Sequence, residues 1–230
     1  MGILNEIDPA DWWALGWFSM CWSGYGWYAD RITARRKGLV HVVHQYRLLW
    51  MQVMLQRDNR IMDSSLVGNL VSSVSFFAST TMYIIAGILA VMGTTEKAIS
   101  FASSFAFVRP ESKVMWEIKL ILLLAIFVYA YFKFTWSLRQ FNRLSILIGG
   151  APLPGASDAE QQQFVRRAGT INSFAGDDFN RGIRAYYFAL AALAWLIQPA
   201  LFMLATAWVV WILYRRDYRS RTLVAVVDGA

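Results

Sequence analysis

Cysteine, histidine and charge are scarce in this chain of 230 residues. Charged residues make up 16% of the sequence, whereas 57% of the residues are hydrophobic. A composition so poor in charge is typical of a chain made of lipid-compatible segments, and it argues against a soluble protein. The one cysteine, Cys21, has no intramolecular partner, which excludes an intrachain disulfide and a thiolate metal cage.

Catalytic motifs are also missing from the sequence. It has no GxSxG elbow, no P-loop, no HExxH and no CxxC, so we expect no enzyme and no cofactor. The two histidines, His41 and His44, share one helix face at i, i+3 spacing, which permits joint metal ligation in principle. No nearby Cys, Asp or Glu completes a known ligand set. Interfacial packing is therefore the favoured role, and zinc or haem ligation is the alternative.

Long apolar segments are what the sequence does contain. Four of them are long enough to cross a hydrocarbon core, which takes about 17 to 25 helical residues. We expect spans at residues 12–28, 66–92, 114–134 and 183–214, with 31–63 and 135–182 forming a cytoplasmic layer. The predicted fold class is all-α: one integral membrane domain, a four-span helical bundle with an amphipathic interfacial helix and a long third helix that extends into the cytoplasm.

Helices are also predicted in the segments that follow the first and third spans. Apolar residues recur near period 3.6 across 31–63, which predicts an amphipathic helix on the cytoplasmic surface or, alternatively, a helix packed on other cytosolic segments. The third helix continues from Val114 to Ile148 without Gly or Pro. Its length of about 50 Å exceeds a bilayer core.

In the C-terminal third of the chain, capping patterns and a proline predict where helices begin and bend. Ser157 and Glu160 form a capping-box pattern that predicts a short helix, and Asp177 and Asp178 are expected to cap the last span rather than to act as catalytic carboxylates. Pro199 predicts a kink in that span, with a freed carbonyl near Trp195 that a neighbouring group can satisfy. A full crossing is preferred here, and a re-entrant pair broken at Pro199 is the alternative.

The distribution of basic residues predicts an orientation. Seven Lys and Arg residues fall between residues 29 and 63 and seven more between 133 and 184, against four between 93 and 119. The positive-inside rule makes the two richer regions cytoplasmic, so the N-terminus lies outside, in a bacterial inner membrane. Four arginines at 215–221 argue against placing the C-terminus outside as well.

Small residues recur on two predicted spans. Such faces let helix backbones approach closely, within one protomer or between copies. The candidate packing residues are Gly16, Ser19, Ser23, Gly26, Gly68, Ser72, Ser75 and Ser79. We expect a homo-oligomer or a membrane-protein partner.

A basic face follows the third span. Helical geometry places Lys133, Trp136, Gln140 and Arg143 on one side, with Arg139 slightly further round. The preferred placement puts Lys133 at the cytoplasmic membrane edge, where the face contacts solute or anionic lipid headgroups. The net charge of +7 is explained by such contacts, and no nucleic-acid partner is expected.

Four blocks, in order, resemble one family: "YRLLWMQVMLQRDNR" with "SFFASTTMYIIAGILAV", then "YFKFTWSLRQFN", then "FNRGIRAYYFALAALAWLIQP", and finally "YRRDYRS". Together they are similar to the membrane-protein family catalogued as domain of unknown function 599. The resemblance covers residues 11 to 221. It implies a polytopic membrane protein of bacteria and plants, and it carries no catalytic residue over to this chain.

These observations favour a non-enzymatic membrane protein. The basic face suggests an oligomeric channel or transporter for an anion or small polar solute, because arginine and lysine at a membrane edge raise the local anion concentration. The alternative is an accessory or scaffold subunit of a larger membrane assembly.

Overall fold

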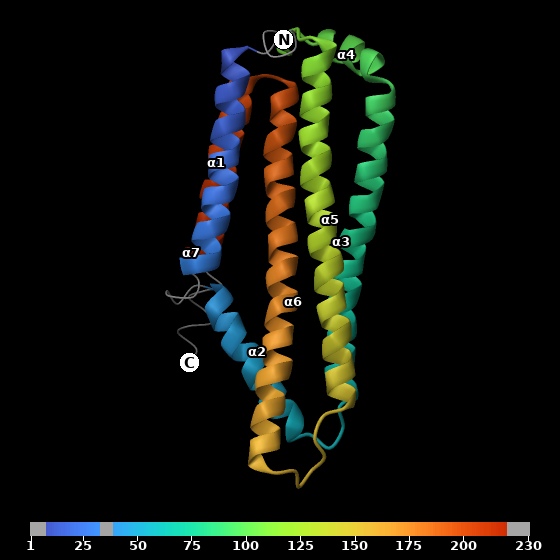
Figure 1. Cartoon of the computed structure of the whole chain (residues 1–230), viewed down its shortest axis with the longest axis vertical. Helices are drawn as coiled ribbons and strands as arrows, with labels where there is room; N and C mark the ends of the chain where they lie inside the picture. Colours follow the sequence, from blue (N-terminus) through green and yellow to red (C-terminus); the bar gives the residue numbers. More distant parts are fainter. Residues whose placement is uncertain (1–7, 33–38, 220–230) are drawn as a thin grey trace, which may run out of the picture.

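A computed structural model describes residues 8–32 and 39–219, and within these ranges the fold is all-α, as predicted. Figure 1 shows most of the long helices running along one axis in alternating directions. The elements are α1 (Pro9–Ile32), α2 (Leu39–Leu55), α3 (Ile61–Gly93), α4 (Thr95–Ser103), α5 (Lys113–Gly149), α6 (Asp158–Leu193), the 3-10 turn η2 (Ala194–Leu196) and α7 (Pro199–Tyr218).

The centre of the bundle is the antiparallel pair α5 and α6, which pack along their length. α3 packs against α5 and touches α6 through Phe77 and Thr81, while α2 and α7 pack against α6, and α1 packs against α7. α1 and α2 follow one another down the long axis (Figure 1). α4 crosses one end of the bundle, termed here the α4 end; the α5–α6 loop forms the far end.

The predictions for the third helix and for the segment 31–63 have different outcomes. The third helix is confirmed as one uninterrupted element, α5, of 37 residues. The predicted helix across 31–63 is divided: α2 covers Leu39–Leu55, α3 already begins at Ile61, and residues 33–38 lie outside the described part of the chain. α2 packs along α6, which matches the alternative interpretation of that segment.

α6 differs more. The capping box at its start is confirmed, since the Ser157 side chain accepts from the Glu160 amide while Glu160 reaches back to the Ser157 amide. The helix then continues for 36 residues, so the prediction of a short helix is wrong. Asp177 and Asp178 lie in its interior and cap nothing. The sequence pattern missed this because packing against α2 and α5 holds the helix through its internal glycines.

The chain reverses direction between α6 and α7, so the prediction of one helix across 183–214 is wrong. Gln198 adopts an extended conformation, and Pro199 is the first residue of the next helix, where its missing N–H and fixed φ carry no penalty. α7 then runs back beside α1 (Figure 1). The rings of Tyr28 and Tyr218 lie 5.7 Å apart, which places the last turn of α7 next to the last turns of α1.

Glycines on α6 allow its neighbours to come close. A Cβ atom added at Gly169 would lie 2.5 Å from the Leu48 side chain of α2, and one at Gly182 would lie 2.5 Å from the Phe134 ring of α5. Gly68 on α3, by contrast, has nothing within 4 Å of that position. The α6 glycines therefore serve packing, which explains their tolerance inside a helix.

Within the part of the chain that the structure describes, two helices, α3 and α5, are long and apolar enough to cross a membrane. α5 is partly covered by α3 and α6, whereas most of α3 outside its α5 contact is exposed.

We predict that Gly182→Ala lowers the stability of the protein. The new methyl group would overlap the buried Phe134 ring, and overpacking of this kind typically costs about 1–3 kcal/mol, more than the helix propensity gained. The midpoint of thermal unfolding of purified protein measures this. Gly68→Ala is the matched control and should leave the midpoint unchanged or raise it; equal shifts for both variants would contradict the packing role of Gly182.

Candidate functional site

A polar cavity of about 310 Å³ lies midway along the bundle, where α1 and α7 end and α2 begins. Convergent polar groups in a concave site are the usual mark of a ligand position. We term it the arginine cavity, because four arginines and three aspartates contribute to its wall. The lining residues are Ala29, Asp30, Val40, Val43, Arg47, Asp177, Asn180, Arg181, Arg184, Arg216 and Asp217.

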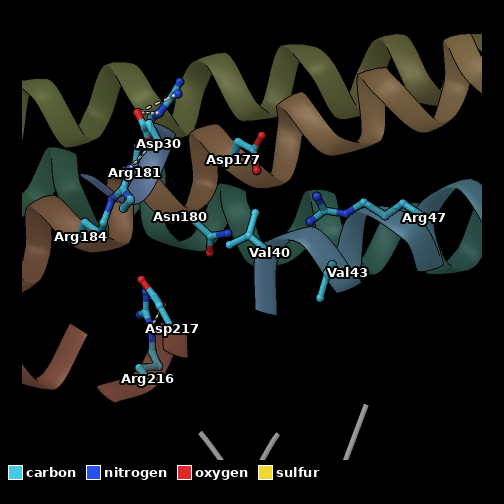
Figure 2. A pocket seen from close by; sticks show the side chains of 11 residues that line it. Asp30, Val40, Val43, Arg47, Asp177, Asn180, Arg181, Arg184, Arg216 and Asp217 are labelled. Atoms are coloured by element: carbon cyan, nitrogen blue, oxygen red, sulfur yellow. Dashed lines mark hydrogen bonds and ion pairs between the residues drawn. The ribbon is translucent and has the colours of Figure 1, made fainter. Parts of the chain in front are cut away.

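Asp30, in the last turns of α1, accepts from two arginines of α6. Arg181 Nη2 lies 3.0 Å from Asp30 Oδ2, and Arg184 Nη2 lies 2.8 Å from Asp30 Oδ1. The two arginines are three residues apart and thus share a helix face. Figure 2 shows Asp30 beside both of them. These ion pairs connect α1 to α6 at one side of the cavity.

α7 closes another side of the cavity through Asp217. Tyr25 of α1 donates its hydroxyl to Asp217 Oδ2 at 2.7 Å, and Arg216 donates Nε–H to Asp217 Oδ1 at 3.0 Å. The Arg216 guanidinium also lies 5.7 Å from the centre of the Tyr187 ring. The α6–α7 reversal is what brings these α7 residues to the cavity.

Arg47 enters from α2 and lies against the backbone of α6. A Cβ atom at Gly176 would lie 1.9 Å from Arg47 Nη2, so a side chain there would displace the guanidinium group. Arg47 donates to the Ser173 carbonyl at 3.5 Å. Burial lowers the pKa of Arg47, and the charge of Asp177 opposes that shift. Burial likewise raises the pKa of the Asp177 carboxyl, against the effect of Arg47 and Arg181. An added anion would favour the charged form of Arg47.

The residues of the predicted basic face do not lie together in the structure. Lys133 points inward, 3.2 Å from Asp178 Oδ1 on α6 and 5.8 Å from the Tyr129 ring centre. Arg139 and Arg143 are exposed, as is Trp136, and Arg143 donates to Gln140 on its own helix. The face is therefore not one site: Lys133 belongs to the charged group around Asp178, and the remainder lies on the surface.

The histidines do not gather metal ligands. His44 Nδ1 lies 2.5 Å from the hydroxyl of Ser173, a contact between α2 and α6, and His41 is half-buried. Across residues 8–32 and 39–219, no group of three or more His, Cys, Asp or Glu could hold a metal ion. The role this supports for His44 is helix packing.

The small-residue faces lie on the outside of the bundle. Gly16, Ser19 and Ser23 of α1 are exposed, as are Gly68, Ser72 and Ser79 of α3, while Gly26 and Ser75 are half-buried. On α1 it is the aromatic side that packs inward, with Phe18 and Tyr25 buried. Packing of these small faces against other helices of the same protomer is thus not observed, and association between copies stays a hypothesis.

A second charged group lies at the α4 end. Lys119 of α5 is 1% exposed, pairs with Glu111 and donates to the Trp195 carbonyl at 2.7 Å. Trp195 Nε1 donates to Asp11 Oδ1 at 2.7 Å, and Asp11 is itself buried. The predicted free carbonyl near Trp195 is confirmed, with Lys119 as its partner. A cation at the C-terminal end of α6 also suits the helix dipole.

Sequence reasoning singled out Asp177 and Asp178 but not the arginine cavity. The cavity residues come from four helices, and the α1 and α6 partners are about 150 positions apart in the chain. One usable signal was present: Arg181 and Arg184 repeat at i, i+3 at the edge of an apolar segment, where unpaired arginines would be costly.

We predict that Lys119→Met strongly destabilises the protein. Removing one partner of a buried ion pair typically costs about 3–5 kcal/mol, because Glu111 and the Trp195 carbonyl lose their donor. Lys113→Met is the matched control on the same helix, since Lys113 pairs with the exposed Glu96. Thermal unfolding should show a large loss for the first variant and almost none for the second; similar midpoints would contradict the assigned role of Lys119.

Comparison with known proteins places the chain in a family. No curated protein and no solved structure matches it. The family model described as "Protein of unknown function, DUF599" matches residues 13–222, which is most of the chain and agrees with the resemblance seen in the sequence. The chain therefore belongs to the DUF599 family of proteins of unknown function.

Proposed function

We propose that the chain is a multi-pass membrane protein with five crossing segments. α3 and α5 have the required length and apolar character. α6 packs along α5, and α7 packs against both α6 and α1. A helix packed along a membrane-crossing helix occupies the same depth, so α1, the C-terminal half of α6 together with η2, and α7 cross with them. The break at Pro199 is the reason for five crossings in place of four.

The outward faces of these helices support the proposal. They carry large apolar side chains that are at least half exposed, which a soluble monomer rarely tolerates as a continuous surface. Examples from three helices are Trp13, Met20, Tyr83, Phe76, Leu204 and Trp208. Lipid is the environment that covers such faces without any protein partner.

Charge distribution supports an orientation with the α4 end outside. Of the 22 Lys and Arg residues, 18 fall in sequence segments at the end of the proposed crossings opposite α4. The four exceptions are Lys97, Arg109, Lys113 and Lys119, which lie in α4, before α5 or in its first two turns. The end of α7, with Arg215 and Arg216, joins the basic side once the chain reverses. In a bacterial cell this orientation puts the arginine cavity at the cytoplasmic edge of the inner membrane.

The arginine cavity supports a role in binding a small anion from the cytoplasm, as the first step of transport. It combines four guanidinium groups with an apolar wall from Ala29, Val40 and Val43. Guanidinium groups bind carboxylate and phosphate through paired N–H donors. The cavity is the single observation that carries this proposal.

The interior favours a transporter over an open channel. Rings fill the space between the arginine cavity and the α4 end. One cluster joins α1, α6, η2 and α7 (Phe18, Trp22, Phe188, Trp195, Phe202), and another joins α3, α5 and α6 (Phe77, Phe127, Phe134, Phe179, Tyr186). An anion would pass only if helices moved apart, as in alternating access.

Association of copies is compatible with this role and with the alternative of an accessory subunit. The exposed faces of α1 and α3 carry small residues that would let a second helix approach. The mass of the purified protein, measured by light scattering, distinguishes a homo-oligomer from a complex with a different subunit.

We predict that the end of α7 lies on the same side of the membrane as the start of α6. Single cysteines at Arg219 and Ala159, in a Cys21→Ser background, should both react with an impermeant maleimide in inside-out vesicles. Ser100→Cys on α4 should react only in right-side-out vesicles. Four crossings would instead place Arg219→Cys with Ser100→Cys, and that result would overturn the five-crossing proposal.

We predict that purified protein binds inorganic phosphate and that Arg184→Gln weakens this binding by about 10- to 100-fold. A charge-assisted hydrogen bond contributes about 1.5–3 kcal/mol, which corresponds to that range. Isothermal titration measures the affinity. Arg139→Gln, an exposed position outside the cavity, is the matched control and should bind as wild type does.

Two results would remove the proposed function. One is the absence of saturable phosphate binding in well-folded wild-type protein. The other is an equal loss in Arg184→Gln and Arg139→Gln, which would indicate non-specific attraction. Phosphate uptake by proteoliposomes then tests the transport step, and binding without uptake would reject the transporter role.

A further inference from the structure

Asp30 is held by two arginines of the arginine cavity and is also open to solvent. Its carboxylate receives three N–H groups from the two guanidiniums: Arg181 Nε at 3.2 Å and Nη2 at 3.0 Å, and Arg184 Nη2 at 2.8 Å. The side chain is nevertheless 41% exposed. A carboxylate with both properties occupies the position that an anionic ligand would use.

Arg181 and Arg184 both belong to α6, and Arg181 has a second carboxylate partner besides Asp30. Arg181 Nη1 also lies 3.5 Å from Asp178 Oδ1, and Asp178 is largely buried and held by Lys133. Arg184 has a side chain that is only 13% exposed. The two donors are therefore positioned by α5 and α6, whereas Asp30 belongs to α1. Loss of the Asp30 contacts would leave two neighbouring guanidinium groups on one face of α6, one of them still beside Asp178.

The remainder of α1 is attached elsewhere. Tyr25 donates to Asp217 of α7, and the Tyr28 ring contacts Tyr214 and Tyr218 of the same helix. Release of Asp30 from α6 would thus free the last turn of α1 without separating α1 from α7.

We propose that Asp30 is a built-in competitor for the anion site: a carboxylate or phosphate group of the ligand displaces Asp30 from Arg181 and Arg184. This inference rests on the anion-binding function proposed above and names the group that regulates it. The two ligand groups share one chemistry, oxygen acceptors for paired guanidinium donors. They come from a free small molecule or from a phospholipid headgroup at the membrane edge.

The volume and the lining of the cavity indicate which groups the ligand carries besides its anionic group. The volume of about 310 Å³ exceeds what a single inorganic anion needs, and Val40, Val43 and the Asn180 amide line the space beyond the arginines. A small organic acid or phosphate ester fits this combination of charged, apolar and amide surfaces. Inorganic phosphate probes the anion subsite alone.

The test compares phosphate affinity among Asp30 variants of the full chain by isothermal titration. Asp30→Asn should bind phosphate about tenfold more tightly than wild type if Asp30 occupies the arginines in about nine of ten molecules. Asp30→Glu keeps the carboxylate and should stay within a few-fold of wild type. Asp58→Asn, an exposed aspartate outside the cavity, controls for net charge.

The outcomes separate this inference from the proposed function. If wild type binds phosphate and Asp30→Asn binds with the same or lower affinity, or no better than Asp58→Asn, the competitor role of Asp30 is wrong and anion binding stands. If no folded variant binds phosphate, both proposals fail. Thermal unfolding of each variant verifies that it is folded.

A second arm identifies the source of the ligand group. Protein in nanodiscs of phosphatidylcholine is compared with protein in nanodiscs that also contain phosphatidylglycerol. A lipid headgroup at the site predicts weaker phosphate binding with phosphatidylglycerol, and this effect should be larger in Asp30→Asn. A free anion predicts equal affinities in both, with the effect of Asp30→Asn retained.

Discussion

The hydrogen bond from Lys119 to the Trp195 carbonyl is the interaction on which the arrangement of the bundle depends. The α6–α7 reversal leaves backbone carbonyls at the end of α6 without helical partners, and these would be costly inside an apolar bundle. The buried ammonium of Lys119 satisfies one of them, and Glu111 balances its charge. Because the chain turns here, α7 runs back along α1, and its last turn brings Arg216 and Asp217 to the arginine cavity.

Two groups of charged residues lie on either side of an aromatic interior, and a third, Arg57 with the buried Asp63, connects the end of α2 to the start of α3. The group at the α4 end holds the reversal and offers little space. The group midway along the bundle surrounds a cavity, and its arginines come from α2, α6 and α7. Buried or half-buried ions are stable only when paired, and each group supplies its own counter-ions. The group that holds the reversal and the group that surrounds the cavity are thus separated along the axis.

Close approach at α6 makes the cavity possible. Gly176 leaves room for the Arg47 side chain, and Gly169, about two turns away on α6, leaves room for Leu48, the next residue of α2. Larger residues at these positions would overlap the Arg47 guanidinium and the Leu48 side chain, which would have to move. The sequence pattern suggested two elements where the structure has one, because Asp177 and Asp178 precede an apolar segment and were expected to cap a new helix.

Local patterns were sufficient to predict the helical character of the chain, the uninterrupted length of α5, the capping box at Ser157 and the free carbonyl near Trp195. These features follow from apolar periodicity, capping chemistry and the missing N–H of proline, which act over a few neighbouring residues. The continuity of α6, the inward position of Lys133 and the pairing of Asp30 with Arg181 and Arg184 became visible only in the folded chain, which also decided between one continuous last helix and a reversal at Pro199. Each of these depends on contacts between segments far apart in the sequence, and no local pattern specifies which helix face will meet which neighbour.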